Sequence, residues 1–414
     1  MLFSKKKKNK KNVHKKGSLR HIFGAFVAVG LLSATPALAQ ERRWSGLQDE
    51  AIYAVGEDGR VFLDQGSDSE VVPASTVKLM TLYMLMESIE RGELSLDDEI
   101  VMSRRADNVP DGYRQTNLVA GQRFTVDYAL RAMFVYSAND IASATGARIS
   151  EVRTGQWAEL SFVELMNAKA VELGMENTEF FDASGMSGSA RTTPEDMSIL
   201  ARAFVSRFPE LFDNDDSFID YPSEPNFRVW GGNRNNTNGL LRDCPCDFQI
   251  PETEFEYVFD DPLNSFGGDP SNRSEIIRSV SLPEEAFSFE VDGLKTGFTL
   301  KAGFSIVSTA VSKHPETGEP YRIFVTYFGG SSANSRNETV LNVFNDAFAQ
   351  HYRDEAILSA RAQDEEALRQ QIYRENGLSY VEDDFHYPFN LDTDYAPYNR
   401  DYRSRNYMFR TPGH

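Results

Sequence analysis

The sequence predicts an α+β fold in which one sheet joins the two ends of a mostly helical domain. Strand-like segments rich in Val, Ile, Phe and Tyr lie at 51–65 and again between 289 and 328, with helical patterns between them. Strands at both ends of a helical middle are typical of α+β domains. With 414 residues, 41% of them hydrophobic, the chain can bury a sizeable core.

Each expected element has a local signal. Residues 51–65 predict a hairpin, with two apolar strands around Glu57-Asp58-Gly59. Thr193-Pro194-Glu195-Asp196 predicts a helix start, with a capping residue, proline at the first helical position and acids in the first turn. The helices expected from apolar periodicity are 75–91, 126–136, 139–149, 160–173, 193–208 and 333–352. The later strands are expected at 289–292, 303–312 and 321–328.

The first 39 residues have the composition of a signal peptide. Lys5 to Lys16 form a basic region, an apolar run from Ile22 to Leu32 follows, and Ala37-Leu38-Ala39 is a small-residue cleavage pattern. We expect the mature chain to begin near Gln40, and an uncleaved anchor stays open as an alternative. No membrane anchor is evident in the mature chain, because no apolar run of about 18 residues appears.

Composition excludes several function classes. Removing residues 1–39, which hold eight Lys and one Arg and no acidic residue, changes the formal charge from −19 to −28. So acidic a protein is not expected to bind nucleic acid. The mature chain has four His, at 314, 351, 386 and 414, and none is near a motif, so a Ser-His-Asp triad is disfavoured. No metal and no cofactor are expected.

Two regions differ in composition from the rest. Residues from about 242 to 290 are acidic and loop-rich and predict a partly flexible insertion. Cys244 and Cys246 within it are expected to be structural or incidental, either as a strained small-ring disulfide or as free thiols. Residues 351–376 predict a charged helix, and 377–414 predict a disordered tail or an irregular docked arm.

The pattern S-x-x-K at Ser75 and Lys78 has an acid–base logic. A helix brings residues three apart onto one face, so the lysine amine can lie near the serine hydroxyl. A lysine can remove the serine proton if burial or nearby cations lower its pKa. Alone the pattern is common, and a helix start with a solvated lysine is then the preferred explanation.

Two further short motifs follow in order. Ser137-Ala138-Asn139 falls between two helical patterns and offers a hydroxyl and an amide; a simple helix cap is its alternative explanation. Lys295-Thr296-Gly297 follows a strand-like segment, where Lys and Thr can bind a carboxylate and Gly permits close backbone approach. Its alternative is a surface strand end with a turn glycine.

The ordered set S-x-x-K, S-x-N and K-T-G resembles the signature of penicillin-binding proteins and β-lactamases. P-A-S-T-V-K-L-M-T, S-A-N-D-I-A, T-P-E-D-M-S-I-L-A-R, V-D-G-L-K-T-G-F-T and N-R-N-N-T-N-G-L-L further resemble the low-molecular-mass D-alanyl-D-alanine carboxypeptidases, serine peptidase family S11. The resemblance covers residues 45–350. It implies a D,D-peptidase domain with the penicillin-binding protein/β-lactamase-like fold: an antiparallel sheet flanked by helices, with a helical subdomain.

The resemblance also implies roles for the catalytic residues. Ser75 is expected to attack the D-Ala-D-Ala bond and form an acyl-enzyme, with Lys78 as general base. Ser137 is expected to help pass a proton to the leaving D-Ala, and Asn139 to hold the peptide amide. Lys295, if it lies near Lys78, is expected to lower the pKa of Lys78 by repulsion.

Binding roles follow in the same way. Lys295 and Thr296 are expected against the substrate carboxylate, beside Gly297, and the backbone N–H of Phe298 is expected to complete an oxyanion hole with that of Ser75. Arg336 sits where the family places an arginine for the terminal carboxylate; a surface helix arginine is the alternative.

The function implied is an exported, periplasmic or otherwise extracytoplasmic serine carboxypeptidase that removes the terminal D-Ala of peptidoglycan stem pentapeptides. β-Lactam antibiotics are the expected covalent inhibitors. The alternatives are a D,D-endopeptidase that cuts crosslinks and a catalytically silent wall-binding homologue. A β-lactamase is disfavoured because no water-activating glutamate is evident; Glu164 is a lookalike within a helical segment.

Overall fold

The computed structural model describes residues 48–212, 222, 226–229, 232–243, 246–248, 254–260, 275–282, 287–314 and 317–375. The expected signal segment 1–39 and the expected tail 377–414 lie outside the described residues, as does Cys244. In the part of the chain that is described, no helix is long and apolar enough to cross a membrane.

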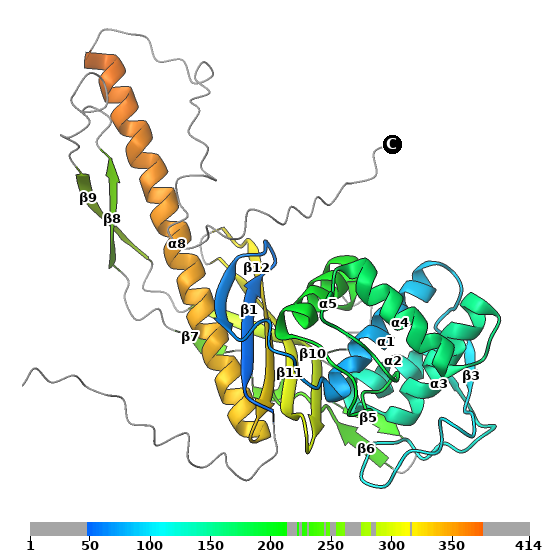
Figure 1. The fold of residues 1–414 in the computed structure, drawn as a ribbon. Coiled ribbons are helices and arrows are strands. Elements are labelled where there is room, and N and C mark those ends of the chain that lie inside the picture. Colours follow the sequence, from blue (N-terminus) through cyan, green and yellow to red (C-terminus); the bar gives the residue numbers. More distant parts are fainter. Residues whose placement is uncertain are drawn as a thin grey trace, which may run out of the picture. The chain divides into compact units, whose positions relative to one another are not determined.

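A six-stranded antiparallel sheet holds the domain together (Figure 1). Its order is β2-β1-β12-β11-β10-β7, and the N-terminal strand β1 pairs along its whole length with the late strand β12. The predicted sheet that joins both ends of the chain is therefore confirmed. The strands are β1 Ala51–Gly56, β2 Val61–Gln65, β7 Cys246–Phe248, β10 Phe287–Thr299, β11 Gly303–Lys313 and β12 Pro320–Gly330.

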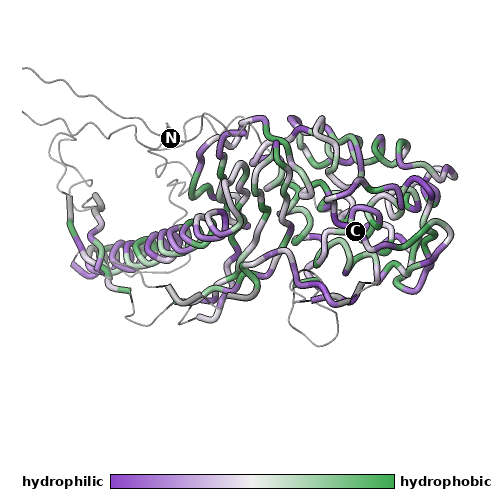
Figure 2. The backbone as a smooth tube through the Cα atoms, turned by 90° about the horizontal axis from the view of Figure 1, so that it is seen from below, coloured by the Kyte–Doolittle hydropathy of each residue, from purple (hydrophilic) through white to green (hydrophobic). Residues whose placement is uncertain are grey.

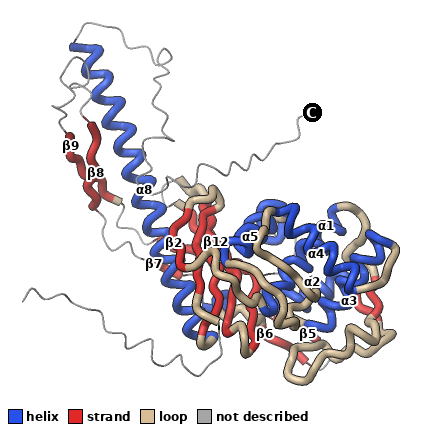
Figure 3. The backbone as a smooth tube through the Cα atoms, in the orientation of Figure 1, coloured by secondary structure: helices blue, strands red, loops and turns tan. Residues whose placement is uncertain are grey.

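Helices cover both faces of this sheet (Figure 3). Side chains of β12 alternate between two hydrophobic clusters, as the period of a strand requires. Val325 belongs to a cluster with Phe344 and Phe348 of helix α8 (Ala333–Glu375), whereas Phe324 belongs to the cluster shared with helix α5 (Pro194–Arg207). The core thus lies in two layers, one on each side of the sheet.

The helical subdomain lies between the two halves of the sheet in sequence. Its helices are α1 Lys78–Glu90, α2 Val126–Arg131, a π-helical turn Ala132–Tyr136, α3 Asn139–Thr154 and α4 Glu159–Leu173, with the small sheet of β3 Glu99–Val101 and β4 Arg123–Thr125. Helix α1 is buried over eleven of its thirteen residues. A helix that is buried on nearly all sides is typical of the centre of a bundle.

Most predicted elements are present, and two extend further than the sequence indicates. The hairpin at 51–65 and the α5 start are confirmed; Thr193 Oγ1 accepts a hydrogen bond from Asp196 N. Strand β10 continues through 287–299. The two expected C-terminal helices form the single helix α8, whose distal part is mostly hydrophilic (Figure 2).

The region of the expected insertion contains strands in its described parts. β7 joins the edge of the main sheet beside β10, while β8 (Glu254–Asp260) and β9 (Glu275–Ser281) form a hairpin. Tyr257 Oη donates to Asp364 of α8 at 2.5 Å, so this hairpin packs against the helix. Upstream lie β5 Asn226–Val229, β6 Gly232–Asn235 and the short helix α6 Leu240–Asp243.

Candidate active site

Ser75 and Lys78 lie together at the start of α1. Ser75 is on a 3-10 turn, Ala74–Val77, which leads directly into the helix that Lys78 opens. Lys78 Nζ is 3.1 Å from Ser75 Oγ. Ser75 is partly exposed, whereas Lys78 is fully buried. The geometry expected from S-x-x-K is therefore present, and the alternative of a solvated lysine is wrong.

Lys78 is held by two further oxygens and has a much lowered pKa. Its Nζ donates to Asn139 Oδ1 at 2.7 Å and to Ser184 O at 2.6 Å. Burial lowers the pKa of Lys78 to about 7 and the Arg114 cation acts in the same direction, while Asp182 and Asp140 oppose them. Near neutral pH, a large fraction of this amine is therefore unprotonated and able to accept a proton.

The turn that carries Ser75 is clamped between two backbone segments. Ala74 has a φ of 51°, in the left-handed region that is unusual for a residue with a Cβ. Gly185 packs against it so closely that a Cβ there would lie 1.8 Å from Ala74 O. On the other side is Gly297, where a Cβ would lie 2.9 Å from Pro73 O. The contacts therefore restrict the position of the backbone that carries Ser75.

K-T-G lies inside strand β10 and not at its end. Lys295, Thr296 and Gly297 pair in register with residues of β11, and the turn of Ser75 packs against them. The alternative of a surface strand end is wrong. The close approach that Gly297 allows here is that of the protein's own backbone at Ser75, whereas the sequence suggested a substrate backbone.

Lys295 and Thr296 are buried beside Lys78. Lys295 Nζ donates to Thr296 O at 2.9 Å, and its pKa is well below the ordinary value because of burial and then because of the Lys78, Arg114 and Arg336 cations. Repulsion between the two lysines disfavours charge on both of them, and for Lys78 burial is the leading cause of the lowered pKa.

Thr296 is tied to the asparagine-rich segment. Its Oγ1 donates to Thr237 Oγ1 at 2.9 Å, and Thr237 N donates to Val135 O at 2.9 Å. Asn238 Nδ2 approaches Gly293 O of β10 at 3.5 Å. The segment therefore connects the K-T-G strand with the turn before Ser137.

S-x-N marks the junction between the π-helical turn and α3. Ser137 is buried and ends the turn with a φ of 63°. Asn139 begins α3, and its Nδ2 donates to Arg114 O at 2.9 Å while its Oδ1 accepts from Lys78. The N-cap of α3 is Ala138, without a side-chain hydrogen bond, so the interpretation of this motif as a polar helix cap is wrong.

Arg336 is buried within the domain at the start of α8. Its Nη1 donates to Ser305 O at 3.3 Å, and Nε and Nη2 donate to Asn337 Oδ1 at 3.0 and 2.7 Å. Burial lowers the pKa of Arg336 to about 10. The alternative of a surface arginine is therefore wrong. Phe298 leaves 48% of its surface exposed, with its ring 4.3 Å from that of Phe304.

The sequence did not predict the loop residues that position Lys78. Asp182 Oδ1 accepts from Ser184 N at 2.6 Å and from Ser184 Oγ at 2.7 Å, and its Oδ2 accepts from Ser187 N at 2.6 Å. This loop presents Ser184 O to Lys78. The sequence Asp182-Ala-Ser-Gly is typical of a turn, and this pattern could have indicated the loop. No sequence pattern indicates Arg114, the nearby cation.

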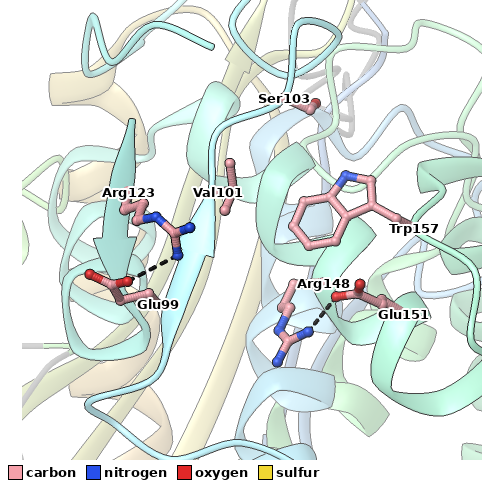
Figure 4. Close-up of a pocket in the computed structure, with 7 residues that line it drawn as sticks. All are labelled: Glu99, Val101, Ser103, Arg123, Arg148, Glu151 and Trp157. Atoms are coloured by element: carbon pink, nitrogen blue, oxygen red, sulfur yellow. Dashed lines mark hydrogen bonds and ion pairs between the residues drawn. The ribbon is translucent and has the colours of Figure 1, made fainter. Parts of the chain in front are cut away.

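A separate pocket of about 440 Å³ lies in the helical subdomain (Figure 4). Ion pairs Arg123–Glu99 and Arg148–Glu151 and the ring of Trp157 line it. No predicted site residue is among its lining. The arrangement that can activate a nucleophile is the one at Ser75 and Lys78, where a hydroxyl lies 3.1 Å from an amine of lowered pKa. Lys295 lies near Lys78 and Arg336, and these cations can attract an anion.

Several known proteins resemble this chain in sequence. The family model described as D-alanyl-D-alanine carboxypeptidase, Peptidase S11, matches residues 47–254. D-alanyl-D-alanine carboxypeptidase DacF of Bacillus subtilis is 26% identical over 333 residues, 78% of this chain and 70% of the relative. DacD of Escherichia coli is 27% identical over 271 residues, 64% of this chain and 54% of the relative, so the chain spans about half of that protein.

Solved structures show the same fold. Penicillin-binding protein 6B from Escherichia coli has a TM-score of 0.52 and 24% identity, covering 72% of this chain and 76% of that one. Penicillin-binding protein 5 from Haemophilus influenzae has a TM-score of 0.53 and 22% identity, covering 72% and 70%. Penicillin-binding protein D2 from Listeria monocytogenes, in its ampicillin-bound form, has a TM-score of 0.51 and 22% identity, covering 72% and 96%. The expected fold is confirmed.

Proposed function

Because the chain belongs to the D-alanyl-D-alanine carboxypeptidase family, peptidase S11, we propose that it removes the terminal D-Ala of peptidoglycan stem pentapeptides through an acyl-enzyme on Ser75. One observation carries the proposal: a partly exposed serine hydroxyl lies 3.1 Å from a buried lysine amine whose pKa is about 7. A serine becomes a useful nucleophile when a base of this kind is in reach.

In the acylation step, neutral Lys78 takes the proton from Ser75 Oγ, and this oxygen attacks the carbonyl carbon of the bond between the two D-Ala residues. The N–H groups of Ser75 and Phe298 stabilise the negative oxygen of the tetrahedral intermediate; one such donor is worth ~3 kcal/mol of barrier. As the intermediate collapses, the proton returns from Lys78 through Ser137 to the leaving amine. Water then attacks the carbonyl carbon of the acyl-enzyme while Lys78 accepts a proton from it. The ester bond to Ser75 breaks, and Lys78 returns the proton to Ser75 Oγ, which restores the free enzyme.

Lys295, Thr296 and Arg336 bind the terminal carboxylate of the substrate in this proposal. The support is their clustering: Arg336 is close enough to Lys295 to lower its pKa, and both are buried. A carboxylate placed among them would neutralise repelling cations.

Asn139 first acts by positioning Lys78. Both ends of its amide are engaged inside the protein, with Lys78 Nζ and with Arg114 O. A contact with the substrate amide, the role expected from the sequence, requires Asn139 to share or release one of these partners.

The surroundings of the enzyme follow from the same function. Residues 1–39 direct export, so the enzyme acts in the periplasm or another extracytoplasmic space where peptidoglycan lies. β-Lactams acylate Ser75 as covalent inhibitors. The related fold of the Listeria protein in its ampicillin-bound form supports this expectation.

A fluorescent penicillin tests the nucleophile. We expect it to label the protein covalently and expect Ser75→Ala to abolish labelling. Ser95→Ala, at an exposed serine beyond the end of α1, is the matched control and should label normally. Undiminished labelling of Ser75→Ala would overturn the assignment.

A substrate comparison tests the bond that is cleaved. We expect release of free D-Ala from a stem pentapeptide. Cleavage of crosslinked dimers without D-Ala release would instead indicate the endopeptidase, and binding to peptidoglycan without either reaction would indicate a silent wall-binding homologue.

A further inference from the structure

Two arginines lie over the ring of Tyr136, the residue directly before Ser137. Arg114 Cζ is 5.5 Å from the ring centroid and Arg234 Cζ is 5.8 Å from it. Arg114 is exposed and comes from the segment between β3 and β4, whereas Arg234 is partly buried and comes from β6. We name these three side chains the arginine rim. A guanidinium over a ring keeps its N–H donors in its own plane, where they can meet another acceptor.

Hydrogen bonds connect the rim to the catalytic residues. The backbone N and the Nδ2 of Asn139 both donate to Arg114 O at 2.9 Å, and Asn139 Oδ1 in turn accepts from Lys78. Arg234 is three residues before Thr237, which accepts from Thr296. Each arginine therefore stands on a segment that the site itself fixes in place.

The rim carries the positive charges of two arginines. Among the residues that the structure describes, no carboxylate forms an ion pair with Arg114 or Arg234, although the full chain carries a formal charge of −19. Arg114 repels Lys78 and Lys295, lowering the pKa of both. Two guanidinium groups that lie near other cations can bind an anionic group of the ligand.

The terminal carboxylate of the substrate already has proposed partners on β10 and α8. We propose that the arginine rim binds a second carboxylate, that of an acidic side chain in the residue that precedes the D-Ala-D-Ala dipeptide. This inference rests on the proposed function and adds a determinant of substrate specificity to it. Arg114 and Arg234 donate to the carboxylate, and the ring of Tyr136 supports the aliphatic part of the same side chain.

Two peptides that differ only in charge test the proposal: N-acetyl-L-Glu-D-Ala-D-Ala and N-acetyl-L-Gln-D-Ala-D-Ala. We expect the intact protein to prefer the Glu peptide in kcat/KM by about tenfold, mainly through KM, and the preference to shrink at high salt. Arg114→Gln and Arg234→Gln should each reduce the ratio of the two kcat/KM values about threefold to fivefold, and the double variant should abolish the preference. Both peptides react at the same Ser75 and Lys78, so an effect of Arg114 on Lys78 cancels in the ratio.

Matched variants separate charge from structure. Arg104→Gln removes an exposed arginine of the same segment and should leave the ratio unchanged. Arg114→Lys keeps the charge but loses the fork of donors, and should retain part of the preference. Penicillin labelling of every variant verifies that the site is folded.

The outcomes distinguish a failure of the arginine rim from a failure of the proposed function. No preference in the intact protein, or one that survives in the double variant, overturns the rim. An equal loss for both peptides also overturns it, because Arg114 then acts on the terminal carboxylate or on Lys78. Absence of D-Ala release from both peptides together with absence of labelling refutes the proposed function itself.

Discussion

Gly297 lies against Ser75 so closely that a Cβ on the glycine would be 3.2 Å from the Ser75 backbone nitrogen. The same Cβ would be 3.2 Å from Thr76 N and 2.9 Å from Pro73 O. These neighbours are backbone atoms, which cannot rotate away. The K-T-G strand and the nucleophile turn are therefore set at a fixed separation by the absence of a side chain.

Gly297→Ala should slow acylation by penicillin at least about tenfold, because β10 and the Ser75 turn must move apart and a misplacement of about 1 Å at a catalytic site can cost ~100-fold. The measurement is the second-order rate constant of labelling. Gly188→Ala is the control, since a Cβ there would meet nothing within 4 Å. Equal rates for both variants would contradict the importance of this contact.

The pH dependence of acylation should report the titration of Lys78. In the proposed mechanism the neutral amine of Lys78 is the active form. The labelling rate should therefore rise with pH, pass its midpoint near 7 and level off above about pH 8, because the pKa of Lys78 is about 7. A lysine with the ordinary pKa of 10.5 would give a rate that still climbs at pH 9. Lys78→Arg cannot lose its proton and should not acylate at any of these pH values.

Asp182 should set the position of that midpoint. Its charge is the strongest influence that raises the pKa of Lys78 against burial. Asp182→Asn should therefore move the midpoint of the rate–pH profile to lower pH, by about 0.5 to 1 unit. Asp68→Asn, which removes an exposed carboxylate, controls for net charge and should leave the midpoint in place. A midpoint shifted upward in Asp182→Asn would contradict the electrostatic account.

The sequence predicted the parts of the site whose side chains act over short range. The spacing of Ser75 and Lys78 on one helix face is a local property, and the structure has it. The sequence did not predict Asp182 or Arg114. Asp182 holds the loop whose Ser184 carbonyl accepts from Lys78, and Arg114 acts on the pKa of Lys78 through its charge. Neither effect leaves a periodic or compositional mark on the chain.

The same distinction explains the elements that were too short. The predicted strand at 289–292 is too short because Lys295, Thr296 and Gly297 interrupt the apolar pattern. In the structure, pairing with β11 and packing against the Ser75 turn keep these residues extended. The predicted helix at 333–352 stops where the apolar pattern fades. The observed helix α8 contains no Gly or Pro before residue 375, and pairs such as Arg361–Glu365 allow a hydrophilic helix to continue.

Stability, as distinct from activity, should depend on Glu87 in α1. No part of its side chain is exposed, and it forms ion pairs with Lys169 at 2.8 Å, Arg207 at 2.9 Å, Arg91 at 3.0 Å and Arg153 at 3.0 Å. Burial alone would raise the pKa of Glu87, but hydrogen bonds from Lys169 and Arg207 and the nearby Arg153 lower it to about 2. The carboxylate therefore joins α1 to α3, α4 and α5.

Glu87→Gln should lower the free energy of unfolding at pH 7 by about 3 kcal/mol, because it leaves the largely buried cations Lys169 and Arg153 without their anion. Since the folded pKa of Glu87 is about 2 and the reference value is 4.5, its contribution is complete above pH 4.5 and is lost as the pH falls through 2. The difference between the intact protein and the variant, measured by urea denaturation, should therefore narrow across that range. Glu172→Gln breaks a pair with Lys169 whose acid is 63% exposed and should cost under about 1 kcal/mol. A loss of equal size in both variants would show that burial of Glu87 is not what makes its ion pairs strong.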